Sequence, residues 1–457
     1  ILFVHGDIPK KVSVSPNGGS FTTLISNSTI GNEQHLVYQD SSTIIRVTAL
    51  TPVGPITNPS YFTDFSAVPD KENALLMITH PTLADASSLY EDYRTSFEGG
   101  SHNVISADVI ELYQQFGGGI NKHINGIRRY SHFMYTQSTE KPEALYLMGK
   151  GIRSSSDSLG AGFRFNSALY SASLISSFGS PPSDICITNG LEGAFKWTPL
   201  IPIGRISTRT DAELEVYLDK VIKYEEQQDS NHIYDSASKD WQKQVLHFTG
   251  GNEGQQAIDF KNWMNNMGNI IEDSLFGAGV TTINKLNSDP FPPTTLNDIT
   301  DRISNGVSLM NYFGHASNSN SGFEINLDDP SNWNNYGKYP VMLVNSCFNG
   351  DVFKSQNSSS EDYVQIADLG AIAYIANVDV GYDIYLRDYS YRLYREFSRE
   401  QYGGGLADQM RISIQNQEIA GENQYLENTC TQMTLNGDPL VKLNWHTKPE
   451  IEITESG

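Results

Sequence analysis

Two short stretches decide the fold prediction: residues 307–317 read VSLMNYFGHAS, and residues 341–350 read VMLVNSCFNG. Each begins with an apolar run typical of a buried strand and ends in small or polar residues. His315 follows the first run, and Cys347 follows the second, 32 residues further on. That spacing suits a strand, a connection and the next parallel strand. Because the carboxyl ends of parallel strands meet at one sheet edge, we predict that imidazole and thiol lie side by side there.

The pairing of a thiol with an imidazole is what nucleophilic catalysis by cysteine requires. The thiolate is the reactive form, and a nearby imidazole takes the thiol proton and later protonates the leaving amine. Gly314 and Ala316 would allow a substrate backbone to approach closely. The backbone amides of Ala316 and Cys347 would face the developing oxyanion. Since a buried thiol or a histidine after a strand is more often structural, only the joint pattern predicts a catalytic dyad of Cys347 and His315.

The rest of the chain predicts an α/β protein behind a β-rich segment. Before residue 70, short β-like runs are broken by Pro, Gly, Asn and Ser. After it, apolar strands alternate with amphipathic helices up to a last strand at 440–444, which indicates mostly parallel sheets flanked by helices. We divide the chain into a β-rich segment, a first α/β subdomain, a second one with the dyad, and a polar tail: 1–69, 70–205, 206–447 and 448–457. Since residue 1 lies within an apolar run, we expect a fragment or processed form.

Charge and cysteine content exclude several classes of protein. Lys and Arg number 31 against 53 Asp and Glu, a formal net charge of −22, and this argues against nucleic acid as a partner because phosphate binding needs clustered cations. A solvated acidic surface explains the charge more simply than recruitment of calcium or a basic substrate.

The three cysteines show no zinc spacing and leave open one disulfide, between Cys186 and Cys430. No apolar run reaches the roughly 18 residues that a transmembrane helix needs.

Several segments resemble the gingipain-like family of cysteine peptidases, peptidase family C25. The segments around His315 and Cys347 carry the resemblance first. Further segments that resemble the family are Pro202-Ile203-Gly204-Arg205-Ile206-Ser207, Lys223-Tyr224-Glu225, Gly370-Ala371-Ile372-Ala373-Tyr374 and Asn436-Gly437-Asp438-Pro439. Together they cover about residues 70–445. The chain is similar in the same way to the related sortase of the type IX secretion system.

The resemblance implies a caspase-like fold of two α/β subdomains with His315 and Cys347 as catalytic residues. It also implies an oxyanion hole made by the amides of Ala316 and Cys347, and the family usually has Gly where this chain has Ala316. Asp184 resembles an acid of the S1 pocket in arginine-specific members, where it would pair with a basic side chain. A turn-closing role is the simpler explanation for this Asp in a Pro-Pro-Ser-Asp sequence. Lys150 stands where members commonly have Asp, and this removes a carboxylate from the face expected to hold the site.

The remaining expectations concern the substrate and its surroundings. Tyr382 follows the predicted strand at 371–376 and is expected to line the substrate-binding surface together with Asp184 and Gly314. The resemblance implies a polypeptide substrate, a secreted or bacterial cell-surface location, and outer-membrane partners in a secretion system. It requires no cofactor and leaves a structural calcium ion as an open expectation.

Three functions are compatible with the sequence. The first is a cysteine endopeptidase, with a narrower version as the sortase that removes C-terminal sorting domains from secreted cargo and passes the acyl group to an amine. The second is a catalytically silent binding or scaffold module, for which the changes at Ala316 and Lys150 argue. The third, another α/β thiol hydrolase, is less favoured because the chain has no Gly-x-Cys-x-Gly elbow.

Overall fold

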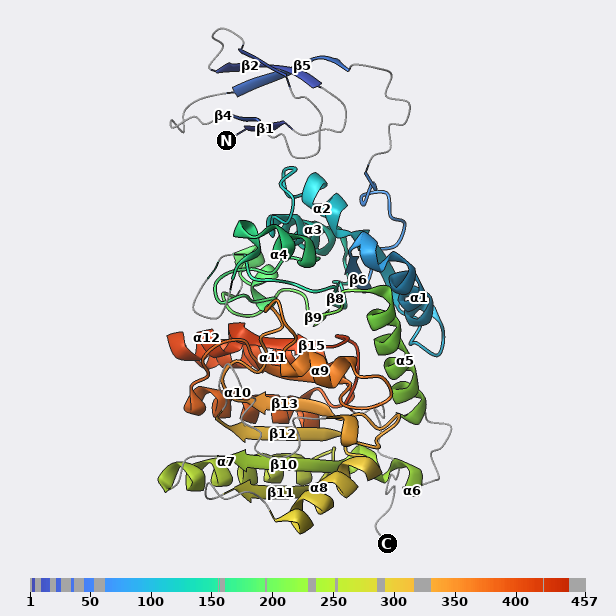
Figure 1. The fold of residues 1–457 in the computed structure, drawn as a ribbon, viewed down its shortest axis with the longest axis vertical. Coiled ribbons are helices and arrows are strands. Elements are labelled where there is room, and N and C mark those ends of the chain that lie inside the picture. Colours follow the sequence, from blue (N-terminus) through green and yellow to red (C-terminus); the bar gives the residue numbers. More distant parts are fainter. Residues whose placement is uncertain are drawn as a thin grey trace. The chain divides into compact units, whose positions relative to one another are not determined.

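The computed structural model describes nearly all of the chain from residue 62 to residue 443 and short strands before it. The described residues are 2–4, 10–16, 22–25, 34–36, 45–52, 62–154, 156, 161–193, 195–228, 236–250, 254–285, 292–315, 330–421 and 423–443. They belong to two compact units (Figure 1). One unit comprises Ile1–Pro69 and Val109–Tyr130, and the other comprises Asp70–Asp108 and Ser131–Gly457.

The first unit contains the β-rich segment. Its described strands are β1 (Leu2–Val4), β2 (Lys10–Pro16), β3 (Thr22–Ile25), β4 (Gln34–Leu36) and β5 (Ile45–Pro52). Strand β2 pairs antiparallel with β3 and β5, and β1 pairs antiparallel with β4. Helix α2 (Val109–Gln115) belongs to the same unit. Phe65, Phe116 and Tyr130 form an aromatic cluster in it, with ring centroids 4.8 to 6.1 Å apart.

The second unit is built on one sheet of ten strands, in the order β11-β10-β12-β13-β14-β15-β9-β8-β6-β7. The strands are β6 (Ala74–Thr79), β7 (Asn103–Asp108), β8 (Ala144–Met148), β9 (Ile203–Ile206), β10 (Gln244–Gly250), β11 (Gly279–Lys285), β12 (Leu309–Gly314), β13 (Val341–Asn345), β14 (Ala373–Asn377) and β15 (Met433–Asn436). Strands β8, β12, β13 and β14 are buried along their whole length. Their continuous apolar sequences are therefore those of strands covered on both faces.

The sheet combines two sets of parallel strands. Strands β10 to β14 are parallel to one another, and β15 is antiparallel to β14 and meets β9 at one pair, Asn436 with Arg205. Strands β9, β8, β6 and β7 are parallel to one another. The predicted α/β, caspase-like fold with mostly parallel strands is confirmed. The predicted last strand at 440–444 is wrong: the described part of that segment follows Gly437, whose φ is 151°, and Pro439, which has no N–H for a ladder.

Helices cover both faces of the sheet. The longer ones in the second unit are α1 (Ala84–Thr95), α5 (Asp211–Gln228), α7 (Gln255–Glu272), α8 (Pro293–Asn305), α9 (Ser359–Gln365), α10 (Asp383–Arg395), α11 (Leu406–Ala420) and α12 (Gln424–Gln432). Strand side chains alternate between faces. Tyr374 of β14 meets Tyr363 of α9, while Asn345 of β13 meets Ser390 of α10. The register pairs Tyr374 with Met342, so these two side chains point to the same face of the sheet. Asn345 is three positions after Met342 on β13 and points to the other face. Helices α9 and α10 therefore lie on opposite faces.

A chain of polar side chains fastens α10 to the strands that end in the predicted dyad. The Tyr394 hydroxyl lies 2.7 Å from Nε2 of His247 and accepts a hydrogen bond from Asn311 at 2.8 Å. Asn345 donates to Asn311 at 3.0 Å and accepts from Ser390 at 2.7 Å. All five side chains are fully buried. Such a network specifies one arrangement of β10, β12, β13 and α10, because each alternative leaves a buried polar group unpaired.

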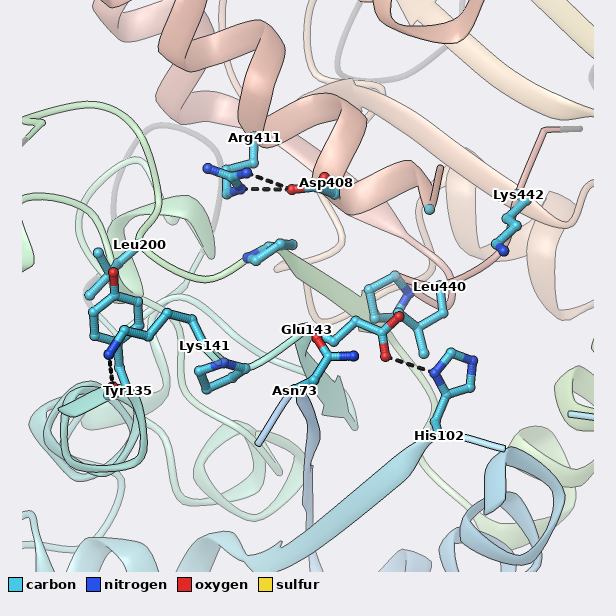
Figure 2. A pocket seen from close by; sticks show the side chains of 14 residues that line it. Asn73, His102, Tyr135, Lys141, Glu143, Leu200, Asp408, Arg411, Leu440 and Lys442 are labelled. Carbon is cyan, nitrogen blue, oxygen red and sulfur yellow. Dashed lines mark hydrogen bonds and ion pairs between the residues drawn. The ribbon is translucent and has the colours of Figure 1, made fainter. Parts of the chain in front are cut away.

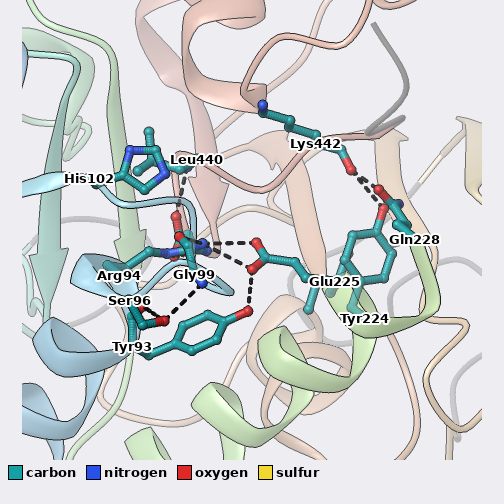
Figure 3. Close-up of polar contacts among 12 residues, drawn as sticks. Tyr93, Arg94, Ser96, Gly99, His102, Tyr224, Glu225, Gln228, Leu440 and Lys442 are labelled. Atoms are coloured by element: carbon teal, nitrogen blue, oxygen red, sulfur yellow. Dashed lines mark hydrogen bonds and ion pairs between the residues drawn. The ribbon is translucent and has the colours of Figure 1, made fainter. Parts of the chain in front are cut away.

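A second buried network explains the Asn-Gly-Asp-Pro sequence at 436–439. The Asp438 carboxylate accepts hydrogen bonds from Nε and Nη2 of Arg94, at 2.9 and 2.6 Å, and from the Tyr90 hydroxyl at 2.6 Å. Arg94 also pairs with Glu225 of α5 at 2.9 Å, and Tyr93 donates to the same carboxylate (Figure 3). The motif therefore ties the end of β15 to α1 and α5. No helix among the described residues is long and apolar enough to cross a membrane.

Candidate active site

The register of β12 and β13 places His315 and Cys347 at equivalent positions on neighbouring strands. The ladder runs from Leu309 paired with Val341 to Phe313 paired with Asn345. This constant offset of 32 positions is also the separation of His315 and Cys347. Each residue therefore stands two positions beyond the last pair, at the carboxyl edge of its strand. The predicted adjacency of the two strands is confirmed.

Cys347 is half-buried and contacts the segment that follows β14. Its Sγ accepts the backbone N–H of Gly381 at 3.4 Å and lies 3.7 Å from the carbonyl oxygen of Gly381. The next residue, Phe348, has φ of 64°, which is rare for a bulky side chain and marks a strained turn. Gly350 is required beside it, because a Cβ there would lie 2.2 Å from the carbonyl oxygen of Ala376. The thiol thus sits on a tight turn packed against the end of β14.

Some backbone amides of this turn donate hydrogen bonds within the protein and one does not. The N–H of Phe348 donates to the carbonyl of Asp379 at 3.0 Å, and that of Gly350 donates to Asn377 at 2.9 Å. The N–H of Cys347 makes no hydrogen bond to any residue that the structure describes. Its predicted role as an oxyanion donor stays a prediction. Ala316, the other predicted donor, lies outside the described residues.

His315 is exposed, and its imidazole contacts α7. Its Nε2 lies 2.9 Å from Oε1 of Gln256, and its ring centroid lies 6.0 Å from that of Phe260. An amide oxygen can only accept, so this contact places a proton on Nε2 and leaves Nδ1 as the basic nitrogen. Gln256 was not predicted from the sequence. The signal was present, because Gln256 follows the carboxyl end of β10, which is the other neighbour of β12.

The close approach of β10 to β12 explains why position 314 is a glycine. A Cβ at Gly314 would lie 2.3 Å from the carbonyl oxygen of Gly250 and 2.3 Å from the Tyr312 hydroxyl. That hydroxyl donates to the His315 carbonyl at 3.0 Å. The glycine is thus needed for the approach of β10 to β12, whether or not a substrate also contacts it. Its predicted substrate contact stays a prediction.

Asp184 lies in a buried ion pair. Its two carboxylate oxygens accept from Nε and Nη2 of Arg205, in β9, at 2.7 and 2.8 Å. Nη1 of Arg205 donates to the carbonyls of Gly149 and Ile175 at 2.7 and 3.2 Å. The Asp184 side chain makes no cap hydrogen bond, so the turn-closing explanation fails. A basic substrate side chain would meet a carboxylate that an internal arginine already neutralises, so the geometry gives the S1 role no support.

Tyr382 is exposed and belongs to a cluster of three tyrosines. Its ring centroid lies 5.1 Å from that of Tyr425 and 6.4 Å from that of Tyr385, with interplanar angles of 72° and 83°. The rings of Tyr385 and Tyr425 are stacked, 5.6 Å apart at 13°. Tyr382 follows Gly381, whose backbone contacts the Cys347 thiol. Tyr382 is therefore the chain neighbour of a residue that contacts the thiol, and its place on the substrate-binding surface stays a prediction.

The sequence matches the model of Peptidase family C25 over residues 68–444. The chain belongs to peptidase family C25. Its structure is similar to the crystal structure of the Arg-specific cysteine proteinase gingipain R (RGPB), with 16% identity, a TM-score of 0.59, and coverage of 83% of this chain and 80% of that chain. It is also similar to the complex of Porphyromonas gingivalis RgpB pro- and mature domains, with 15% identity, a TM-score of 0.58, and coverage of 82% and 81%. These likenesses show the fold.

A third solved structure is similar to this chain only weakly. Dimeric latent PorU from Porphyromonas gingivalis aligns with 12% identity and a TM-score of 0.29, over 54% of this chain and 36% of that chain, and carries no argument. No curated protein matches the sequence.

In this C25 chain, Lys150 is part of a second buried ion pair. Its Nζ contacts Oε1 of Glu361 at 2.5 Å, and Ser207 donates to the same oxygen at 3.0 Å. Burial lowers the pKa of Lys150 to about 8, although Glu361 opposes the shift. Lys150 follows the carboxyl end of β8. Lys150, which stands where the resemblance implies an Asp, is thus paired with the buried carboxylate of Glu361.

A cavity of about 410 Å³ lies away from the dyad of the C25 chain, at the amino ends of β6 to β9 (Figure 2). His102 and Glu143 form an ion pair of 2.7 Å on one side of it, and Arg411 pairs with Asp408 at 2.8 Å on another. None of the predicted site residues lines it. The catalytic proposal therefore rests on the strand-end geometry and not on this cavity.

Metal and disulfide chemistry find no support in the described part of the C25 chain. No group of three His, Cys, Asp or Glu there could hold a metal ion, so the calcium expectation stays a prediction. None of Cys186, Cys347 and Cys430 forms a disulfide. The disulfide between Cys186 and Cys430 that the sequence left open is not formed. Burial raises the pKa of the Cys430 thiol well above its ordinary value, which makes it inert.

Proposed function

We propose that this C25 chain is a cysteine endopeptidase in which Cys347 is the nucleophile and His315 moves the protons. The observation that carries the proposal is the shared register: both residues stand two positions beyond the last ladder pair of adjacent parallel strands. Adjacent strands lie about 4.8 Å apart, within reach of a thiol and an imidazole that turn toward one another. Membership of a peptidase family gives this geometry a chemical meaning.

Acylation would begin with a proton transfer from the thiol of Cys347 to Nδ1 of His315. The contact of Nε2 with Gln256 holds the imidazole in the tautomer that can accept this proton. The thiolate then attacks the substrate carbonyl carbon, and the imidazolium gives its proton to the leaving amine as the C–N bond breaks. The product is a thioester on Cys347 and a free new amino terminus.

The oxyanion that forms during attack needs donors already in place. The N–H of Cys347 makes no hydrogen bond within the described residues and sits on the strained turn at Phe348. A tight turn fixes such an amide, so its reorganisation during the reaction costs little. We propose the amide of Ala316 as the second donor, from its place next to His315.

The thiol must leave its contact with Gly381 to meet the imidazole. Sγ accepts from the N–H of Gly381 at 3.4 Å, and a rotation about the Cα–Cβ bond of Cys347 would release it. Substrate that binds beside Gly381 and Tyr382 would compete for the same backbone groups. Binding and release of the thiol would thus be coupled, because both involve the segment after β14.

Deacylation would return the enzyme to its starting state. A water molecule gives a proton to His315 and attacks the thioester, and the thiol leaves with that proton.

We further propose that the protein is secreted or attached to the cell surface and works with outer-membrane secretion partners. The sortase version uses the same thioester and differs only in the acceptor, an amine in place of water. The support for location and sortase role is the resemblance of the sequence alone.

The experiment is to follow cleavage of an unfolded polypeptide by the purified chain and by Cys347→Ala and His315→Ala. We expect no cleavage by the first variant and a loss of about 100-fold or more in kcat/KM for the second. Cys186→Ala and His132→Ala are matched controls. Cys186 is another half-buried cysteine outside any disulfide, and His132 is an exposed histidine paired with Glu192. Both controls should cleave at the rate of the unchanged chain.

Two results would contradict the proposal. Cleavage that persists in Cys347→Ala would assign the nucleophile to another residue. A chain that folds but cleaves none of a varied set of polypeptides would favour the silent binding module. Addition of an amine nucleophile separates the sortase version, because transpeptidation yields an amide of the amine and simple hydrolysis does not.

A further inference from the structure

We infer that the side chains of Val380, Tyr382, Ile384, Tyr385 and Tyr425, here called the tyrosine patch, bind an uncharged apolar or aromatic side chain of the polypeptide substrate. The inference rests on the proposed function, because the patch would act only if Cys347 is the nucleophile. It adds the chemical class of side chain that the site selects.

The patch exposes more large apolar surface than its position in the fold explains. Four of its side chains, Val380, Tyr382, Ile384 and Tyr425, are between 46% and 50% exposed. They come from two elements that are distant in sequence, the segment entering α10 and the first turn of α12. Isolated exposed apolar residues are ordinary, but a contiguous group of this kind marks a contact surface.

The rings of the patch are held in a fixed arrangement. Tyr385 and Tyr425 are stacked, and Tyr382 stands nearly perpendicular to both. Asn423, at the N-cap of α12, donates to the Tyr385 hydroxyl at 3.3 Å. Rigid aromatic side chains supply contact area at low cost in conformational entropy, because each has only two rotatable bonds. The patch is therefore preorganised for a side chain that brings apolar area.

The patch is joined to the nucleophile through the backbone of one residue. Tyr382 directly follows Gly381, whose N–H donates to the Cys347 Sγ. α10, which carries Tyr385, is fastened to β13 through the hydrogen bond from Ser390 to Asn345. A substrate whose scissile carbonyl lies at Sγ would place a neighbouring side chain on these rings. The occupant is thus a residue of the substrate that flanks the cleaved bond.

Charge argues for an uncharged occupant. The acid that would receive a basic side chain, Asp184, is buried against Arg205. Two other carboxylates border the patch: Asp379 accepts the N–H of Val380 at 2.7 Å, and Asp383 accepts that of Ile384 at 2.8 Å. Both are thus partly committed to their own backbone, and both would repel an acidic side chain. Their attraction for a lysine is the rival explanation that the experiment addresses.

The test uses peptidyl acyloxymethyl ketones, which alkylate an active-site thiol after binding as a substrate does. Four side chains, Phe, norleucine, Lys and Glu, are placed in turn at each of the two positions preceding the ketone. The rate of Cys347 alkylation is then measured. Norleucine is the neutral counterpart of Lys, so their ratio isolates the charge. At one of the two positions we expect Phe and norleucine to react about tenfold faster than Lys, and Glu to react slowest.

Variants of the patch complete the test. Tyr382→Ala and Tyr425→Ala should slow the Phe ketone about tenfold, whereas Tyr425→Phe should react like the unchanged chain. Tyr336→Ala is the matched control, because Tyr336 is 54% exposed and lies beside Lys223 instead. Rates of the Phe ketone that are equal in all these variants would overturn the inference, as would a fastest reaction with Lys at both positions.

Iodoacetamide, which has no side chain to recognise, separates this inference from the proposed function. Alkylation of Cys347 by iodoacetamide that depends on His315 supports the dyad. If that dependence holds while no peptidyl ketone reacts, or while Lys is preferred at both positions, the inference fails and the dyad stands. If the dependence is absent, the proposed function fails first. Equal iodoacetamide rates in the tyrosine variants show that their fold around Cys347 is intact.

Discussion

Nε2 of His315 lies 2.9 Å from Oε1 of Gln256, so the imidazole that the sequence predicts as a base is oriented by a neutral amide. The contact comes from the first turn of α7, which follows β10 in the chain. Among the described residues, the His315 side chain forms no ion pair, and the two side chains that it contacts, Gln256 and Phe260, carry no charge. The residue at position 256 therefore sets both the tautomer and the local charge of the base.

We predict that Gln256→Glu shifts alkylation of Cys347 to lower pH. A carboxylate beside Nε2 favours the protonated imidazole, and an imidazolium in turn favours the thiolate. The thiolate should then persist to a lower pH than in the unchanged chain. Gln256→Leu, which has no acceptor, should lower the alkylation rate about tenfold without this shift. The measurement is the rate of alkylation by iodoacetamide between pH 5 and pH 9.

The matched control for this pair is Gln255→Glu, one position earlier in the same helical turn. Gln255 donates to Asp259 at 2.9 Å and is exposed. The variant Gln255→Glu should leave the pH dependence of Cys347 alkylation unchanged. A profile that moves equally in both variants would show a general charge effect, and it would remove Gln256 from its positioning role.

Loss of Asp438 is predicted to destabilise the whole sheet. Its carboxylate is fully buried and accepts hydrogen bonds from Arg94 and Tyr90. Asp438→Ala leaves the Arg94 guanidinium with only one of its two acidic partners in a buried site. We expect a loss of about 3–5 kcal/mol in the free energy of unfolding, measured in urea. Asp368→Ala removes the exposed partner of Lys223 and should cost less than about 1 kcal/mol. Equal losses would show that the buried network adds nothing.

Glu396 is predicted to make stability fall as the pH rises. Its side chain is fully buried, its Oε1 accepts a hydrogen bond from Asn416 at 2.9 Å, and burial raises its pKa from 4.5 to about 7. The folded state therefore holds this proton more tightly than the unfolded state does. Its contribution is present below about pH 4.5 and is lost as the pH rises through about 7.

The variant Glu396→Gln separates this effect from the rest of the titration. The unchanged chain should lose about 2 kcal/mol of unfolding free energy relative to Glu396→Gln between pH 5 and pH 8. Glu215→Gln, on the exposed face of α5, is the control and should follow the unchanged chain at both values. A difference between Glu396→Gln and the unchanged chain that is constant with pH would contradict the prediction.

The sequence predicted the strands that hold the candidate dyad because their signals are local. The runs before His315 and Cys347 are apolar throughout, and a spacing of 32 residues suggested adjacent parallel strands. Strand β15 was missed because Met433–Asn436 is short and continues directly from α12, so no turn residue separates them.

The pairing of charged residues could not be predicted, because it depends on contacts between distant segments. Asp184 was interpreted as a specificity residue, yet its partner Arg205 lies in a strand 21 positions away. Lys150 was interpreted as a lost acid, yet Glu361, 211 positions away, neutralises it. Gln256 and Tyr425 joined the candidate site in the same way. Local sequence gives the type of each side chain but not its neighbour.

The central claim is that His315 activates the thiol of Cys347. The most direct measurement is the rate of iodoacetamide alkylation at Cys347 and Cys186 in the same sample at pH 7, resolved by peptide mass spectrometry, in the unchanged chain and in His315→Ala. Neither thiol forms a disulfide and both are half-buried, so Cys186 is an internal reference. We predict that Cys347 reacts at least about tenfold faster than Cys186, and that His315→Ala removes this advantage without changing the rate at Cys186. Equal rates at the two cysteines in the unchanged chain, or an advantage that survives in His315→Ala, would contradict the account.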